Sequence, residues 1–195
     1  YVAPNPMVGA VLVYHSSYGD VIMGEGWHEQ YGGPHAEPNC IRAAEQAHPE
    51  GIDYQSCTLY VNLEPCSHYG KTPPCAELII RKGIGRVVVG MLDPNPQVAG
   101  RGVKMMQDAG IEVVVGVLEE ECLRLNKRFV CLHTEGRPYV ILKWAQTLDG
   151  YIDVARNSGT PLIISTSLTT QLVHQQRAEN MSIMVGTRTV LLDNP

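Results

Sequence analysis

The hydrophobic positions of the chain fall into short runs that alternate with polar turns and helically spaced segments. Residues 7–14 form an apolar run with β-branched side chains, and residues 21–27 form a second run beyond a polar turn at 16–20. This pattern predicts a β-hairpin. Further strands are predicted over residues 58–63, 86–91 and 111–115. Helical spacing predicts helices over residues 36–48, 75–82, 102–109 and 118–133.

Strands and helices alternate from residue 58 onward, and this alternation predicts a largely parallel sheet that is covered by helices on both faces. The polar segment 134–138, with Gly136 and Pro138, is the best domain boundary. Beyond it, the pattern predicts strands over 139–144 and 182–185 and a helix that includes 171–178. The chain starts without Met and stops within a run of elements, so we expect a part of a longer protein.

Composition narrows the classes of function. The chain has 195 residues, of which 44% are hydrophobic and 18% charged, and these values are typical of a soluble globular protein. A net charge of −5 gives no basic field for nucleic acid, and no apolar run is long enough for a membrane helix. Of the six cysteines, four are scattered through apolar segments and do not form a dense framework: Cys40, Cys57, Cys122 and Cys131. No signal peptide precedes them, so we expect a reduced, cytoplasmic protein.

The main chemical signal is a set of three metal-ligand side chains and one acid. His35, Cys66 and Cys75 supply one imidazole and two thiolates, the kind of three-ligand set that leaves a fourth zinc position to water. Glu37 follows the histidine by two residues and is free to move a proton to a leaving amine, as the non-ligating Glu of zinc deaminases does. His35 and Glu37 lie at a predicted helix start, where the chain can turn both toward one metal.

Two alternatives compete with this interpretation. One is another zinc deaminase, acting on cytidine or on a tRNA adenosine, although eight residues separate Cys66 from Cys75 where the usual signature has two. The other is a non-catalytic, zinc-stabilised binding module, in which Cys57 or His68 would supply a fourth ligand.

Four segments carry specific motifs: residues 4–9, 34–37, 63–75 and 93–102. Together they resemble the bifunctional deaminase/reductase family of riboflavin biosynthesis. Residues 143–150 and 185–195 are similar to the first third of that family's dihydrofolate-reductase-like second domain. The resemblance implies a three-layer αβα cytidine-deaminase-like domain over residues 1–136, without the family's N-terminal helix. It also implies that residues 137–195 are the N-terminal part of a dihydrofolate-reductase-like α/β domain.

The activity implied by the resemblance is zinc-dependent hydrolytic deamination of 2,5-diamino-6-ribosylamino-4(3H)-pyrimidinone 5′-phosphate. In the intact protein it is followed by NADPH reduction of the ribosyl group to ribityl. The partner is therefore a small phosphorylated pyrimidine, and a homo-oligomer is expected.

The resemblance also assigns binding residues. Those of the deaminase substrate site are Asn5, His28, His68, Lys71, Asp93 and Asn95. Those near the reductase substrate are Lys143, Asp149 and Arg177, and those on the NADPH side are Ala145, Thr189 and Asp193. Lys71 suits its role because an ammonium group can neutralise a phosphate.

Overall fold

The computed structural model describes residues 2–69, 73–96, 98–155 and 160–193. The chain divides into two compact units, residues 1–139 and residues 140–195.

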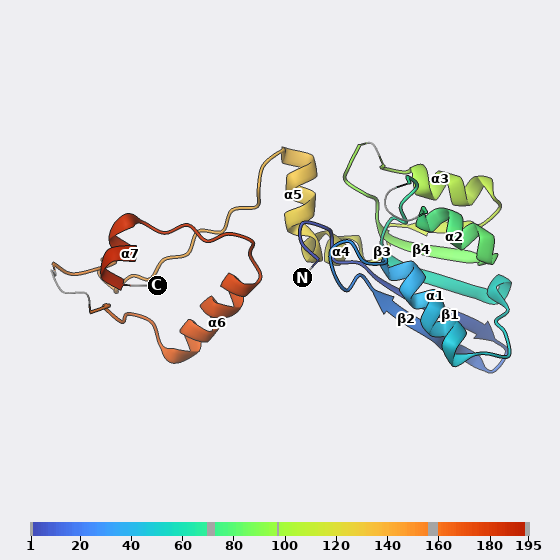
Figure 1. Cartoon of the computed structure of the whole chain (residues 1–195), viewed down its shortest axis with the longest axis horizontal. Helices are drawn as coiled ribbons and strands as arrows, with labels where there is room; N and C mark the ends of the chain where they lie inside the picture. Colours follow the sequence, from blue (N-terminus) through green and yellow to red (C-terminus); the bar gives the residue numbers. More distant parts are fainter. Residues whose placement is uncertain (1, 70–72, 97, 156–159, 194–195) are drawn as a thin grey trace. The chain divides into compact units, whose positions relative to one another are not determined.

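The described residues of the first unit form a five-stranded mixed sheet (Figure 1). The spatial order is β2 (Gly19–Trp27), β1 (Gly9–Ser16), β3 (Cys57–Leu63), β4 (Arg86–Met91) and β5 (Glu112–Val115). The predicted hairpin is confirmed, since β1 and β2 pair antiparallel. The strands from residue 58 onward are parallel, as their alternation with helices predicted: β3 pairs with β4 and β4 with β5. The sheet as a whole is mixed, because β1 inserts between β2 and β3 and is antiparallel to both.

Helices cover both faces of this sheet. On one face lie α1 (Ala36–Ala47), α2 (Cys75–Lys82) and α3 (Arg101–Asp108), with α1 packed against β1 and β2. A Cβ atom on Gly26 would lie 2.2 Å from the backbone nitrogen of Cys40, so glycine is what lets α1 approach β2 closely. On the other face, α4 (Glu119–Leu125) packs against β3 and β4.

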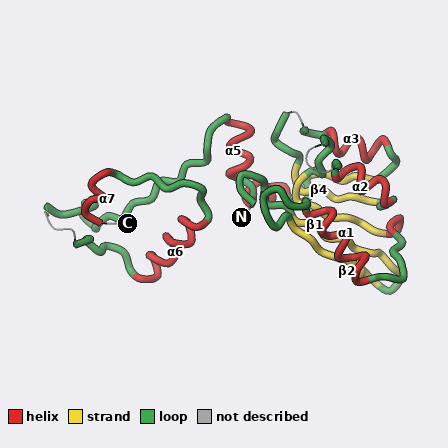
Figure 2. The backbone as a smooth tube through the Cα atoms, viewed as in Figure 1, coloured by secondary structure: helices red, strands yellow, loops and turns green. Residues whose placement is uncertain are grey.

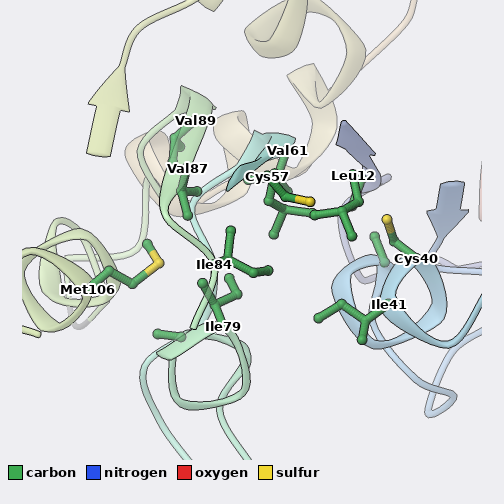
Figure 3. Close-up of a cluster of buried hydrophobic side chains, with 14 of the residues drawn as sticks. Leu12, Cys40, Ile41, Cys57, Val61, Ile79, Ile84, Val87, Val89 and Met106 are labelled. Carbon is green, nitrogen blue, oxygen red and sulfur yellow. The ribbon is translucent and has the colours of Figure 1, made fainter. Parts of the chain in front are cut away.

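The main core lies between the sheet and the first three helices (Figure 3). Cys40 and Ile41 of α1 point toward Leu12 of β1, and Ile79 and Met106 come from α2 and α3. This burial of aliphatic side chains, at roughly 25 cal/mol per Å² of apolar surface, is the main stabilising contribution. It fixes the starts of α1 and α2, where the predicted metal ligands lie.

The helix predicted over 118–133 is wrong as a single element. The structure has α4 and then α5 (Lys127–Glu135), with a break at Asn126. The Asn126 side chain is buried and pairs with the Met7 backbone: its Oδ1 accepts from the Met7 N–H at 2.8 Å, and its Nδ2 donates to the Met7 carbonyl at 3.0 Å. This long-range pairing, which periodicity does not report, accompanies the break.

The second unit contains α6 (Ser167–Ala178) and α7 (Thr187–Asp193) joined by long loops (Figure 2). The helix that includes 171–178 is confirmed, and it begins earlier because the Thr166 side chain accepts from the Thr169 N–H. The strands predicted over 139–144 and 182–185 are wrong, because no ladder partner meets these apolar runs among the described residues of this unit. Within the described ranges, no helix has both the length and the apolar composition needed to span a membrane.

Candidate metal centre and active site

Three chain segments bring the predicted zinc ligands together. His35 directly precedes α1 as its N-cap, Cys66 follows β3 by three residues, and Cys75 is the first residue of α2. Their ligand atoms all lie within 4.8 Å of one another. Cys66 also accepts a hydrogen bond at its Sγ from the Cys75 N–H at 3.3 Å, so the amino end of α2 faces this sulfur.

The donor atoms have separations that suit a tetrahedral zinc ion. His35 Nδ1 lies 3.6 Å from Cys66 Sγ and 3.4 Å from Cys75 Sγ. Zinc bonds of about 2.0–2.1 Å to nitrogen and about 2.3 Å to sulfur, at tetrahedral angles, require nitrogen–sulfur separations of about 3.5 Å. The three residues therefore fit a zinc ion in both chemistry and spacing.

The two thiols influence each other's ionisation. The hydrogen bond from Cys75, together with the one from His35, lowers the pKa of Cys66 to about 4 despite burial. The hydrogen bond with Cys66, followed by burial, raises the pKa of Cys75. One thiolate thus opposes the other, and a divalent cation between them would favour both thiolates.

Glu37 lies in the first turn of α1 and is only 3% exposed. Burial raises the pKa of its carboxyl group, which is the expected effect of removing a carboxylate from water. Among the residues that the structure describes, none forms a hydrogen bond with its Oε2 atom. A buried carboxylate oxygen without a partner costs free energy, so this atom has the character of a functional group rather than a structural one.

Asn5 and His28 form a hydrogen-bonded pair beside the ligand His35. The buried His28 ring bonds the Pro34 carbonyl through Nδ1 at 2.9 Å, which places its proton on that nitrogen. Its Nε2 atom then accepts from Asn5 Nδ2 at 3.0 Å. The His28 and His35 rings meet edge-on, with centroids 5.5 Å apart. Two of the predicted substrate residues are thereby connected to the metal centre.

Asp93 and Asn95 lie in the loop after β4. Both are half-buried, and the Asn95 N–H donates to Asp93 Oδ1 at 2.8 Å. Burial raises the pKa of Asp93, and the hydrogen bond from the Asn95 N–H is the largest effect that lowers it. His68 is exposed. Lys71 lies outside the described residues, so its predicted contact with phosphate stays a prediction.

The residues predicted for the reductase site all lie in the second unit. Two of them are exposed, Lys143 and Asp149. The other four are half-buried: Ala145, Thr189, Asp193 and Arg177, which lies near the end of α6. Asp149 alone among them lines a cavity of about 360 Å³, which is bounded by Thr147, Tyr151, Asp153, Val154, Ala155 and Leu162. The structure does not bring the other five into this cavity.

Sequence reasoning missed Glu64, a buried carboxylate two residues before Cys66. Each of its oxygen atoms accepts from two backbone N–H groups: Oε1 from Gly102 and Val103, and Oε2 from Asp93 and Gly100. The available signal was a glutamate beside the Pro-Cys ligand motif, together with a later helix that starts after Gly100, a residue with no side chain to cap it.

Comparison with known families defines the class of protein. Residues 1–91 match the model of the cytidine and deoxycytidylate deaminase zinc-binding region, and residues 138–195 match that of the RibD C-terminal domain. The fold and the triad of ligand side chains thus belong to a zinc-binding deaminase domain, which confirms the predicted fold class.

Similarity over the whole of this chain narrows the class of protein to one group of relatives. The chain is 48% identical over 195 residues to the riboflavin biosynthesis protein RibD of Aquifex aeolicus and 43% identical over 192 residues to that of Escherichia coli. The two matches cover 100% and 98% of this chain, but only 51% and 49% of the relatives. The chain is homologous to RibD proteins over its whole length, as the resemblance predicted, and spans about half the length of the curated relatives it matches.

Two solved structures of related enzymes resemble this chain. A diaminohydroxyphosphoribosylaminopyrimidine deaminase/5-amino-6-(5-phosphoribosylamino)uracil reductase from Thermotoga maritima is 48% identical, with a TM-score of 0.85, covering 100% of this chain and 52% of that one. A Rib2 deaminase from Aspergillus oryzae in complex with DARIPP is 27% identical, with a TM-score of 0.56, covering 69% of this chain and 86% of that one.

Proposed function

We propose that this chain catalyses the hydrolytic deamination of 2,5-diamino-6-ribosylamino-4(3H)-pyrimidinone 5′-phosphate. The proposal rests mainly on the environment of Glu37. Its buried Oε2 atom lacks a hydrogen-bond partner in the described structure, and its neighbours are the three proposed zinc ligands. The substrate class rests on the family, because the Thermotoga maritima relative bears the name of such a deaminase.

The residues divide the chemistry among them. A zinc ion held by His35, Cys66 and Cys75 would act as a Lewis acid and lower the pKa of a water molecule. Glu37 accepts a proton from the attacking water, holds it in a site shielded from solvent, and delivers it to the departing amine nitrogen, which leaves as ammonia. The burial that raises the pKa of Glu37 suits it for both accepting and releasing this proton.

The binding residues orient the substrate around this acid. Asn5, fixed by His28, is proposed to bond the pyrimidine ring, and Asp93 and Asn95 are proposed to bond the ribose. His68 and Lys71 are proposed to face the phosphate. The fixed tautomer of His28 leaves the Asn5 side-chain oxygen free of that pair and available to accept from an amino group of the ring.

The alternatives are less well supported. A closed structural zinc site needs a fourth protein ligand, but Cys57 bonds the Asp53 carbonyl and His68 is exposed; within the described ranges, neither belongs to the metal-ligand group. A cytidine or tRNA adenosine deaminase is disfavoured because similarity to RibD proteins extends over the whole chain.

The second unit is proposed to belong to an NADPH-dependent reductase. Its match to the RibD C-terminal domain supports this assignment, with Lys143, Asp149 and Arg177 near substrate. Ala145, Thr189 and Asp193 are proposed to face the cofactor. We also propose a cytoplasmic homo-oligomer. All six cysteines, which lie among the described residues, are free, and this supports a reducing compartment.

The proposal is tested by supplying the purified, zinc-loaded chain with the diamino pyrimidine phosphate and, separately, with cytidine, and by measuring ammonia release. We expect release from the pyrimidine phosphate and none from cytidine. Zinc binding without release from either substrate would instead support a binding module.

A further inference from the structure

We propose that Glu64 is a positioning residue that holds in place the substrate-side loop after β4, of which residues 93–96 and 98–100 are described. This inference rests on the proposed deaminase function. Glu64 follows β3 directly and lies two residues before the ligand Cys66. Its side chain is only 4% exposed.

The carboxylate of Glu64 holds both ends of this loop. Its Oε2 atom accepts from the Asp93 N–H at 3.1 Å and from the Gly100 N–H at 2.9 Å. Asp93 and Gly100 lie on either side of Asn95 in the sequence, and Asn95 is proposed to bind the substrate together with Asp93. A single oxygen atom therefore sets the separation between the ends of the loop.

The other oxygen atom of Glu64 supplies the cap that α3 lacks. This helix starts after Gly100, which has no side chain to bond the free N–H groups of the first turn. Glu64 Oε1 accepts from Gly102 at 2.8 Å and from Val103 at 3.2 Å instead. The negative charge is favourable at the positive end of the helix dipole. The four backbone N–H groups satisfy the carboxylate of Glu64 without a cation.

Gly102 makes this close approach possible. A Cβ atom at this position would lie 2.0 Å from the Pro65 carbonyl oxygen, so α3 contacts the backbone of the ligand segment directly. The Glu64 N–H also donates to the Met91 carbonyl at 2.9 Å, which anchors the backbone of Glu64 independently of its side chain. Altering the carboxylate should therefore disturb the substrate-side loop and leave Cys66 in place.

The Glu64→Gln variant tests this role. The amide retains one acceptor oxygen and places an NH₂ group against two backbone N–H donors, so half of the four-bond arrangement is lost. We expect the variant to keep its zinc while KM for the pyrimidine phosphate rises about 10-fold to 100-fold and kcat changes far less. The matched control is Glu112→Gln, which removes an exposed carboxylate that is paired with Arg86; its KM should equal that of the wild type.

A second variant, Gly102→Ala, moves the start of α3 away from Glu64 by steric contact with Pro65 while the carboxylate stays intact. It should reproduce the rise in KM, and it decides the question if Glu64→Gln does not fold. A Glu64→Gln chain that unfolds at a lower temperature but keeps the wild-type KM well below that temperature would overturn the inference, because its role would then be structural. Absence of deamination by the wild type would overturn the proposed function, and with it this inference.

Discussion

The two units of the chain use similar apolar sequence patterns with opposite results. In the first unit, Leu12 and Leu59 are fully buried between the sheet and its helices. In the second unit, Leu148 and Met184 are almost completely exposed, and neither α6 nor α7 contains a buried residue. An apolar run forms a strand only where a neighbouring strand completes its backbone hydrogen bonds and a helix covers its face.

This contrast has a functional counterpart. The proposed deaminase residues are held by α1, α2, β3 and the loops that the first core fixes. The proposed reductase residues lie on exposed loops and two short helices, and only Asp149 lines the cavity. We therefore expect the first unit to contain a preformed site and the second unit to contribute none in this chain.

The largest expected effect is the loss of the metal. Cys75→Ser replaces a thiolate with a hydroxyl group, which is a poor zinc ligand, and should reduce the zinc content from about one ion per chain to near zero and abolish deamination. Zinc content after dialysis, measured by elemental analysis, checks this. The control is Cys57→Ser, whose hydroxyl can replace the thiol that donates to Asp53; it should retain zinc and activity. Loss of zinc in both variants would contradict the assigned ligand set.

The next effect separates catalysis from metal binding. Glu37→Gln removes the proton acceptor and leaves the three ligand side chains unchanged, so zinc should be retained while turnover falls by about 10²-fold to 10⁴-fold. Single-turnover deamination and zinc stoichiometry, measured on one preparation, check both parts. A near-normal rate in this variant would falsify the proton-transfer assignment.

A smaller effect tests the difference in packing between the two units. Leu12→Ala should lower the free energy of unfolding by about 2–5 kcal/mol, because it leaves a cavity among fully buried side chains. Leu148→Ala, at a residue that is 109% exposed, should change it by less than about 0.5 kcal/mol. Urea denaturation, followed by circular dichroism, measures both. Equal losses would show that the second unit also has a packed core.

The sequence predicted those features that local spacing or a characteristic short motif marks. The hairpin and the start of α2 at Cys75 follow from residues close together in the chain. The set of His35, Cys66 and Cys75 follows from residue types that suit zinc, although His35 and Cys75 are 40 residues apart. The break at Asn126 and the four bonds of Glu64 could not be predicted in either way, because their partners are backbone groups of distant residues, and no residue type marks such groups. The strands expected in the second unit were wrong because periodicity reports a capacity for burial and does not supply the partner.

The most direct test of this account measures two activities of the whole chain in one preparation. Ammonia release from the diamino pyrimidine phosphate reports the first unit, and NADPH oxidation in the presence of the deaminated product reports the second. Positioning of reactants alone is worth about 7–11 kcal/mol of a barrier, and the exposed loops of the second unit do not supply it. We expect ammonia release without NADPH oxidation. NADPH oxidation by this chain, or zinc-loaded protein that releases no ammonia, would contradict it.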